Sequence, residues 1–238
     1  MNVILRNHTL AAIESTDLAA LLPHLSECQL ERGAVLIRPG DPVVELFFPT
    51  TVFLATNVTF SDGRSALTFV TGADGVCGLA PFLAEQPSVW GVEVKSSGGA
   101  YRLPACELRR QMEGSPGLRK QLLRLSYDYQ AQAAYGVGCA ALHGSMSRLA
   151  SFLLRSADRL GSDELNLTQQ DVADFLGQQR TTVNAAAKGL KAVGAIRYNR
   201  GTIQITDREA LIQEACECYE ATKGGHAQGN DESPSQTP

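Results

Sequence analysis

The sequence of 238 residues has few aromatic side chains and no long apolar run. Aromatic residues make up 6% of the chain, with a single Trp. No uncharged stretch approaches the roughly 18 apolar residues that a membrane-spanning helix needs. The start, MNVILRNHTL, lacks a basic flank followed by a long apolar stretch, so no secretory signal is expected. Hydrophobic residues still reach 44%, enough for real cores in two domains. We expect a globular cytoplasmic protein with no membrane partner.

The cysteines show no pattern of disulfide or metal binding. They stand at positions 28, 77, 106, 139, 216 and 218, without a CxxC pair, and in a chain without an export signal we expect reduced thiols. Cys216 and Cys218 are two apart on an expected helix, where they would point to different faces and could not bind one metal ion. The four histidines have no metal-ligand spacing. The sequence therefore predicts no metal site.

Motifs of common enzyme classes are also missing. There is no HExxH, no GxSxG and no phosphate-binding GxxxxGK[ST]. An enzyme that works in the N-terminal part would need a clustered acid–base pair, and none is visible. We therefore predict that the protein is not an enzyme.

Charge is distributed unevenly along the chain. Residues 1–100 carry 5 basic and 10 acidic groups, whereas residues 165–208 carry 6 basic and 3 acidic groups. Within Gly177–Thr206 there are basic residues and no acidic residue at all. This asymmetry indicates that the C-terminal module binds a polyanion and that the N-terminal module does not.

Residues 30–103 have the short alternating segments of β structure. The expected strands cover residues 30–37, 45–48, 52–60 and 66–70. The turn Ser61–Arg64 contains Asp-Gly, which is a strong signal for a hairpin between the last two strands. Several short strands at close spacing predict a small antiparallel roll or barrel.

From about Pro104 the apolar period becomes that of a helix. The apolar positions are Leu118, Leu122, Leu125 and Tyr129. Their 4-3-4 spacing predicts a long amphipathic helix over roughly 115–142. We interpret this narrow seam, extended to Gly136, as a dimerisation face where two backbones approach closely. An ordinary core helix is the alternative. A second helix is expected over Ser145–Leu160, ended by Gly161.

Residues 168–193 fit a helix-turn-helix. Thr168 begins a capping box for the first helix, and Gln178–Val193 can form the second. Helix-turn-helix packing needs a small residue, a glycine in the turn and a β-branched residue on the second helix, and Ala173, Gly177 and Val183 supply them. Residues 195–206 then predict a basic hairpin, or wing.

Polar and basic side chains lie on the expected outer face of the second helix and on the wing. The predicted DNA-contacting residues are Thr168, Gln178, Gln179, Arg180, Thr181, Thr182, Asn184, Lys188, Arg200 and Thr202. Arg can bond guanine bidentately, and Gln and Asn can read adenine. The alternative interpretation is a merely solvated helix.

This order of elements resembles the Crp/Fnr superfamily of bacterial transcription regulators over about residues 10–222. The stretch LNLTQQDVADFLGQQRTTVNAAAKGLKAVGAIRYNRGTIQITD is similar to that family's DNA-binding domain. The resemblance implies an α+β chain: a jelly-roll-like antiparallel β-roll with a cyclic-nucleotide-binding-like fold, a long dimerisation helix and a C-terminal winged helix-turn-helix. The expected boundaries are 10–114 for the roll, 115–143 for the helix, 144–222 for the DNA-binding domain and 223–238 for a disordered tail.

The resemblance also implies site residues. By similarity, Gln179, Arg180 and Asn184 occupy base-reading positions. This chain has Thr181 and Ala185 where better-known members carry an acidic residue and a second Arg. The family's usual operator is therefore not expected.

Members that bind cyclic nucleotides hold the ribose with a Gly-Glu-Leu motif and the phosphate with an Arg-Ser/Thr-Ala motif. This chain has Gly78-Leu79-Ala80 and Pro87-Ser88-Val89 in those places, and no Lys or Arg in Ser65–Val94. A buried phosphate without a cation is strongly disfavoured. We therefore expect that cyclic AMP is not the effector, and we predict no cofactor.

Together these features predict a sequence-specific transcription regulator that binds palindromic double-stranded DNA as a homodimer. The sequence leaves open whether an effector bound in the roll controls DNA binding. It also leaves open whether RNA polymerase is a further partner. The alternative is a small-molecule-sensing module that acts through protein contacts without DNA readout.

Overall fold

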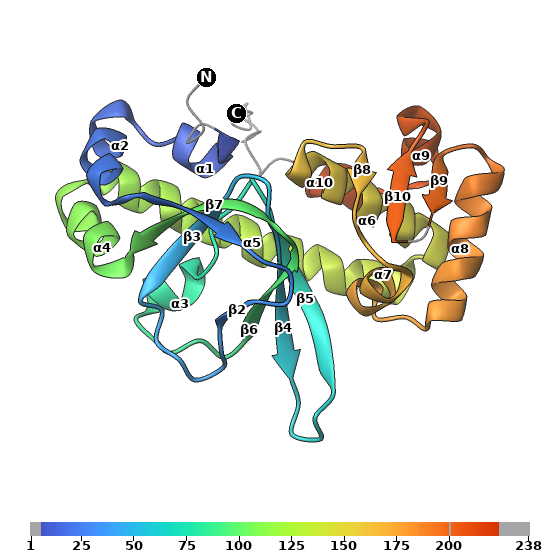
Figure 1. Cartoon of the computed structure of the whole chain (residues 1–238), viewed down its shortest axis with the longest axis horizontal. Coiled ribbons are helices and arrows are strands. Elements are labelled where there is room, and N and C mark those ends of the chain that lie inside the picture. Colours follow the sequence, from blue (N-terminus) through green and yellow to red (C-terminus); the bar gives the residue numbers. More distant parts are fainter. Residues whose placement is uncertain (1–5, 200, 224–238) are drawn as a thin grey trace, which may run out of the picture.

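The computed structural model describes residues 6–199 and 201–223. An N-terminal β part and a C-terminal, mainly helical part lie side by side, and one long helix runs behind both (Figure 1). This is the α+β arrangement that the sequence predicts.

Strands β1 to β7 form two antiparallel sheets with strand orders β1-β7-β3 and β2-β6-β4-β5. The strands are β1 (Ser26–Leu30), β2 (Val35–Ile37), β3 (Glu45–Pro49), β4 (Phe53–Thr59), β5 (Ser65–Thr71), β6 (Gly91–Ser96) and β7 (Gly98–Pro104). The Asp-Gly hairpin is confirmed: β4 pairs with β5, and Gly63 turns the chain with a φ of 83°. Leu46, Phe48 and Leu103 are among the side chains that fill the core of this roll.

The roll also contains helices, and a break between its first two strands, that the sequence does not predict. The helices are α1 (His8–Ala11), α2 (Ser15–Leu21), the 3-10 turn η2 (Leu22–His24), α3 (Leu79–Ala84) and α4 (Ala105–Gly114). The single strand predicted over residues 30–37 is wrong: β1 ends at Leu30, and a turn with Gly33 at a φ of 86° leads to β2. A positive φ is incompatible with a continuous strand.

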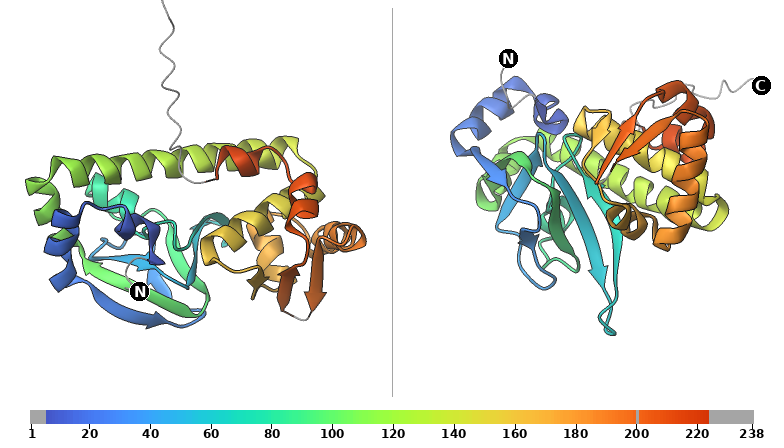
Figure 2. Two further views of the ribbon diagram at one scale, coloured as in Figure 1. Left: turned by 90° about the horizontal axis from the view of Figure 1, so that it is seen from above. Right: turned by 45° about the vertical axis from the view of Figure 1, so that its right-hand side comes forward.

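The long helix α5 (Pro116–Leu142) agrees with the predicted span. Ser115 caps it, since its hydroxyl accepts a hydrogen bond from the backbone N–H of Leu118 at 3.1 Å. Seen from above, α5 extends along both parts of the molecule (Figure 2). Neither it nor another helix within residues 6–199 and 201–223 is long and apolar enough to cross a bilayer.

The 4-3-4 seam of α5 does not face outward, and the prediction that it pairs two subunits is wrong for its apolar positions. Leu118 and Leu122 are 1% and 0% exposed and belong to the core of the roll. Leu125 and Tyr129 pack against the same core. Apolar spacing shows that a stripe is buried, but the neighbour that buries it here is the roll of the same chain. Gly136 is exposed, and a Cβ there would have no neighbour within 4 Å.

The C-terminal part contains the remaining helices and a sheet of order β8-β10-β9. They are α6 (Ser145–Leu160), β8 (Glu164–Leu165), α7 (Gln169–Leu176), α8 (Arg180–Ala192), β9 (Ile196–Asn199), β10 (Thr202–Ile205), α9 (Arg208–Glu214) and α10 (Cys218–Ala221). The predicted span of α6 is confirmed, with Gly161 left-handed at its end.

A continuous helix through Cys216 and Cys218 is not formed. Helix α9 ends at Glu214, Ala215 is extended with a ψ of 152°, and α10 begins at Cys218. The prediction that the two thiols point to different faces of one helix is therefore wrong.

Candidate nucleic-acid interface

Helices α7 and α8 form a helix-turn-helix whose start is set by a capping box. The backbone N–H of Asp171 donates to the Thr168 hydroxyl at 3.1 Å, and the Asp171 carboxylate accepts from the backbone N–H of Thr168 at 2.8 Å. Each residue thus satisfies a free backbone donor of the helix start. The carboxylate also lies in the first turn, where negative charge is favourable.

The turn between the helices depends on a glycine. Gly177 has a φ of 60° and ψ of 39°, a left-handed conformation that costs other residues free energy. The backbone N–H of Gln178 then donates to the carbonyl of Ala173 at 3.0 Å, which closes the end of α7. Ala173 and Val183 are buried where the two helices meet. The combination expected from the sequence is therefore present.

Helix α6 supports the pair from behind. Leu149, Leu153, Val172 and Leu190 belong to one buried cluster that joins α6, α7 and α8. Helices α6 and α8 also approach closely at Gly189, because a Cβ there would lie 2.7 Å from the sulfur of Met146. This packing holds α8 as a rigid element whose outer face is free.

The outer face of α8 carries most of the predicted DNA-contacting side chains. Those that are exposed are Thr168, Gln179, Arg180, Thr181, Thr182 and Lys188. The Arg180 Nε donates to the Gln169 side chain at 3.2 Å. This hydrogen bond orients the guanidinium at the start of α8. Gln179, Arg180, Thr181, Thr182 and Lys188 form the exposed polar strip of α8, whereas Thr168 is the N-cap of α7.

Two of the predicted residues are placed differently. The Gln178 amide donates to the Ser145 hydroxyl at 2.9 Å and is half-buried, so this side chain joins the turn to α6. Asn184 is half-buried, and its Oδ1 is covered without a hydrogen-bond partner in the described part of the chain. Both are less accessible than Gln179 and Arg180.

Strands β9 and β10 form the wing. Ile203 and Ile205 are buried and anchor it to the helices, and Thr202 pairs with Asn199 beside the turn. Thr202 is half-buried and its hydroxyl lies 3.4 Å from the Asn166 side chain. Arg200, predicted at the tip, lies outside the described residues.

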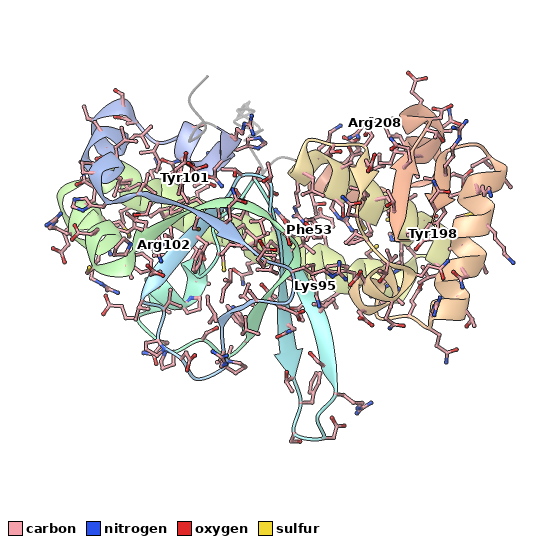
Figure 3. The ribbon with its side chains drawn as sticks, in the orientation of Figure 1. Phe53, Lys95, Tyr101, Arg102, Tyr198 and Arg208 are labelled. Atoms are coloured by element: carbon pink, nitrogen blue, oxygen red, sulfur yellow. The ribbon has the colours of Figure 1, made fainter. Side chains whose placement is uncertain are left out.

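The helix-turn-helix rests against the roll through an ion pair and an aromatic contact. The Arg32 guanidinium donates to both carboxylate oxygens of Asp171 at 3.0 and 2.9 Å. Phe53 on β4 meets Phe175 on α7 edge-on, with ring centroids 5.8 Å apart. Figure 3 shows Phe53 at the boundary between the two parts, with Tyr198 on the far side. Burial acts to raise the pKa of Asp171, but hydrogen bonds from Thr168 and Arg32 outweigh it and lower that pKa.

In the two segments compared above with cyclic-nucleotide motifs, residues 78, 79 and 88 take part in the packing of the roll, whereas Pro87 and Val89 are exposed. Gly78 begins α3 with a φ of 88°, and Leu79 is buried in the core. Ser88 is buried, and its hydroxyl donates to the Trp90 carbonyl at 2.7 Å. A separate cleft of about 520 Å³ lies between β5, α5, α6 and α7 and is lined by Arg148, Arg155 and Arg159 among others.

Comparison with known proteins agrees with this geometry. Residues 147–214 match the Crp-like helix-turn-helix domain. The CRP-like cAMP-activated global transcriptional regulator of Mycobacterium tuberculosis is 24% identical over 220 residues, which cover 90% of this chain and 98% of that protein. The anaerobic regulatory protein of Bacillus subtilis is 21% identical, covering 86% of this chain and 90% of that protein.

Among solved structures, FixK2 from Bradyrhizobium japonicum superimposes with a TM-score of 0.71 at 18% identity, covering 81% of this chain and 98% of that one. The roll, the long helix and the winged helix therefore recur together in a known arrangement. Residues 147–214 therefore form a Crp-like helix-turn-helix domain, and the chain is similar over most of its length to DNA-binding transcription regulators of the Crp/Fnr family.

Proposed function

We propose that the protein acts as a homodimer that reads a pseudo-palindromic DNA site through α8 of each subunit. The observation that carries this is the exposed polar strip of α8 within a stretch, Gly177–Thr206, that has no acidic residue. Two such helices placed by a two-fold axis enter successive major grooves about 34 Å apart. Such a role places the protein with the chromosome, in the cytoplasm.

Base reading in this proposal rests on the first turns of α8. Gln179, Arg180 and Thr181 are exposed there, at the end of the helix that enters the groove. Arg180 suits a guanine and Gln179 an adenine. Lys188, one to two turns later, supplies phosphate attraction that does not depend on sequence and that salt screens.

The proposed domains follow the boundaries predicted from the sequence. In this proposal residues 10–114 form a sensor-like roll, residues 115–143 the dimerisation helix and residues 144–222 the DNA-binding domain. The ends of α4 at Gly114 and of α5 at Leu142 support the two internal boundaries. The predicted tail over 223–238 lies outside the described residues beyond Lys223.

We place the dimer seam on the exposed side of α5 instead of the buried one. Leu123, Tyr127 and Val137 are 51%, 63% and 73% exposed. With Ala134 they fall on a coiled-coil stripe of alternating four- and three-residue steps, in which the position between Tyr127 and Ala134 is the polar Gln130. Gly136 lies beside this stripe and leaves room for a second backbone. Exposed apolar side chains in such a row are typical of an interface.

Cyclic AMP is not the effector in this proposal, although the mycobacterial relative is named as activated by it. The place of the ribose-binding Glu is taken by the buried Leu79, and the place of the phosphate-binding Arg by Pro87, next to the buried Ser88. A phosphate buried there would have no cation from Ser65–Val94. Calorimetry with cyclic AMP should give no heat of binding, and micromolar affinity would contradict this part.

The DNA-reading assignment is tested by selecting bound sequences from random oligonucleotides and repeating the selection with variants. Arg180→Ala should weaken the selected site by roughly 1–3 kcal/mol and relax one base pair in each half-site. Lys188→Ala should weaken all sequences alike and reduce the salt slope by about one. Arg64→Ala, on the exposed β4–β5 hairpin, is the control and should bind as wild type. If the protein selects nothing and binds DNA at neither of two salt concentrations, the alternative of a module acting through protein contacts is correct.

The dimer assignment is tested by sedimentation. Val137→Glu should shift the protein to monomer and lower its affinity for a full site, because a charge would be placed in the seam. Val89→Glu is a matched control on the roll, since Val89 is exposed to 72%. A dimer that survives Val137→Glu and Tyr127→Glu together would show that another surface pairs the subunits.

A further inference from the structure

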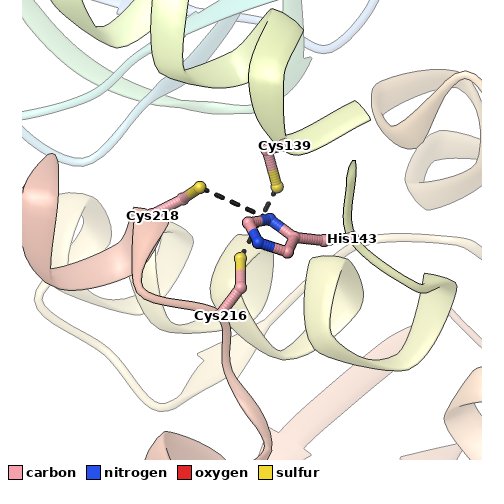
Figure 4. Close-up of side chains that lie close together, drawn as sticks. All are labelled: Cys139, His143, Cys216 and Cys218. Carbon is pink, nitrogen blue, oxygen red and sulfur yellow. Dashed lines mark hydrogen bonds between the residues drawn. The ribbon is translucent and has the colours of Figure 1, made fainter. Parts of the chain in front are cut away.

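Three cysteines and one histidine from distant parts of the chain meet beside the end of α5. Cys139 lies in the last turn of α5, and His143 follows that helix directly. Cys216 and Cys218 come from the segment where α9 ends and α10 begins. The three sulfurs and a ring nitrogen all lie within 4.8 Å of one another. Figure 4 shows the four side chains pointing toward one centre.

Two of the distances between these atoms match the edges of a tetrahedron around one metal ion. The sulfurs of Cys139 and Cys216 are 3.5 Å apart, and the sulfur of Cys218 lies 3.6 Å from Nδ1 of His143. Around a zinc ion with bonds of about 2.3 Å to sulfur and 2.0–2.1 Å to nitrogen, two sulfurs are about 3.8 Å apart and a sulfur and a nitrogen about 3.6 Å. Sulfurs that bind different irons of a cluster are further apart than sulfurs on one ion, so the set favours a single ion.

The surroundings of the four residues are those of a metal site. The other ring nitrogen of His143, Nε2, lies 3.2 Å from the Glu217 carboxylate. A carboxylate on the far side of a ligating histidine fixes the ring and its tautomer. The Ser151 hydroxyl lies 3.1 Å from the Cys216 sulfur and accepts a hydrogen bond from the Cys216 backbone N–H at 3.1 Å. Both outer contacts orient a ligand toward the centre.

Burial and charge also suit a bound cation with thiolate ligands. All three cysteines are buried, and they form a small cluster of their own. Ordinary core packing does not explain a buried cluster made of thiols with a histidine at its edge. Burial lowers the pKa of Arg155, and the nearby Cys139, Cys216 and Cys218 act in the opposite direction. A nearby cation offsets the net negative charge that three thiolates leave on a divalent ion.

We propose that Cys139, His143, Cys216 and Cys218 bind one Zn²⁺ ion. Three soft thiolates and an imidazole are a typical zinc donor set, and four protein ligands leave no open position for catalysis. The site is therefore structural. It ties the end of α5, where the chain turns into α6, to a segment more than seventy residues later. The expectation from the sequence that no metal site exists is revised on this geometry.

The experiment measures metal content in the full chain, without DNA, so its outcome is independent of the proposed function. Protein purified under reducing conditions without chelator should contain about one zinc per chain by mass spectrometry of the elements. Cys216→Ser and His143→Ala should lose the zinc, whereas Cys106→Ser, an exposed thiol on α4, should retain it. Glu217→Gln should keep the ligands and weaken affinity roughly 10–100-fold.

A second measurement does not depend on the folding of variants. A mercurial reagent that titrates the thiols of the wild-type protein should release the zinc, detected with a metal-sensitive dye. Cobalt added to the reduced apoprotein should then give the d–d absorption of tetrahedral Co²⁺ together with thiolate charge-transfer bands. Wild-type protein that is folded, contains no zinc and gives no such cobalt spectrum would overturn the proposal. So would a mass two hydrogens below that of the reduced chain in the metal-free protein, since it would identify a redox thiol pair instead.

Discussion

Replacing Asp171 with alanine removes two interactions that start from one carboxylate. The side chain caps α7 by accepting from the Thr168 backbone N–H and hydroxyl at 2.8 and 2.7 Å. It also holds the DNA-binding part against the roll through Arg32 at 2.9 Å. The variant therefore removes the acceptor of the Thr168 backbone N–H and the carboxylate partner of Arg32, whose guanidinium keeps its hydrogen bond to the Lys95 carbonyl.

The expected loss of stability follows from these contacts. A lost helix cap costs about 1 kcal/mol, and an unmade hydrogen bond to a charged group about 1.5–3 kcal/mol. The Arg32 side chain is 47% exposed, so its ion pair adds at most about 1 kcal/mol. We expect a total of about 2.5–5 kcal/mol. For a chain of this size each kcal/mol shifts Tm by about 2–4 °C, which predicts a fall of about 5–20 °C.

Chemical and thermal denaturation of four proteins separate the contributions. Arg32→Ala leaves the cap of α7 intact, breaks the ion pair with Asp171 and the exposed hydrogen bond to the Lys95 carbonyl, and should cost about 0–1 kcal/mol. Asp174→Ala is the matched control on the same helix, because Asp174 is exposed and bonds only to Gln170. It should change stability by less than about 0.5 kcal/mol. The double variant of Arg32 and Asp171 gives the coupling energy between the two parts.

The contribution of Asp171 to the free energy of unfolding should decrease at acidic pH. The folded-state pKa of Asp171 lies below its ordinary value. Its contribution is therefore fully present above the unfolded pKa of about 3.9 and is lost as pH falls through the folded pKa. The difference in stability between wild type and Asp171→Asn should be constant near neutral pH and narrow below about pH 4. A difference under about 0.5 kcal/mol at pH 7, or one that grows on acidification, would refute the reasoning.

Three further substitutions test the backbone and core. Gly177→Ala should cost about 1–2 kcal/mol, because Gly177 is left-handed and no neighbour would obstruct the new Cβ; denaturant titration measures it, and no loss would mean that the turn adopts another conformation. Tyr129→Phe should cost about 1–3 kcal/mol in the same assay, since the buried hydroxyl accepts from the Val76 backbone N–H at 2.6 Å. An unchanged midpoint would mean that water replaces the hydroxyl. Gly98→Ala should destabilise the roll and speed hydrogen exchange of its strands, because the Cβ would lie 2.6 Å from the backbone nitrogen of Val52; wild-type exchange would contradict that contact.

The elements defined by local signals could be read from the sequence. The capping box at Thr168, the left-handed Gly177 and the Asp62-Gly63 hairpin each depend on residues within a few positions of one another. Helices α5 and α6 carry their own apolar period and end signals. These choices are made by backbone sterics and short-range hydrogen bonds, so the winged helix-turn-helix and its likeness to a known family were accessible before the fold.

The side of α5 that is buried could not be read in this way. The helix has two apolar stripes, one through Leu118 and Leu122 and one through Leu123 and Val137. The periodicity indicates that each stripe is buried against another surface. Which surface buries it depends on how the roll packs against α5. For this reason the 4-3-4 spacing alone predicts an intersubunit seam where the structure has an intrachain core.

The thiol and imidazole cluster was equally inaccessible. Its two halves, Cys139 with His143 and Cys216 with Cys218, are separated by the whole winged helix-turn-helix. Cys139 and His143 are four residues apart and can share a helix face, but two ligands without a visible second pair do not indicate a metal site. Local chemistry thus determined which segments become helices, strands and turns. The packing of α5 and α6 against the end of α9 determined which distant side chains meet, because long-range contacts depend on the summed burial of many surfaces and leave no short-range trace.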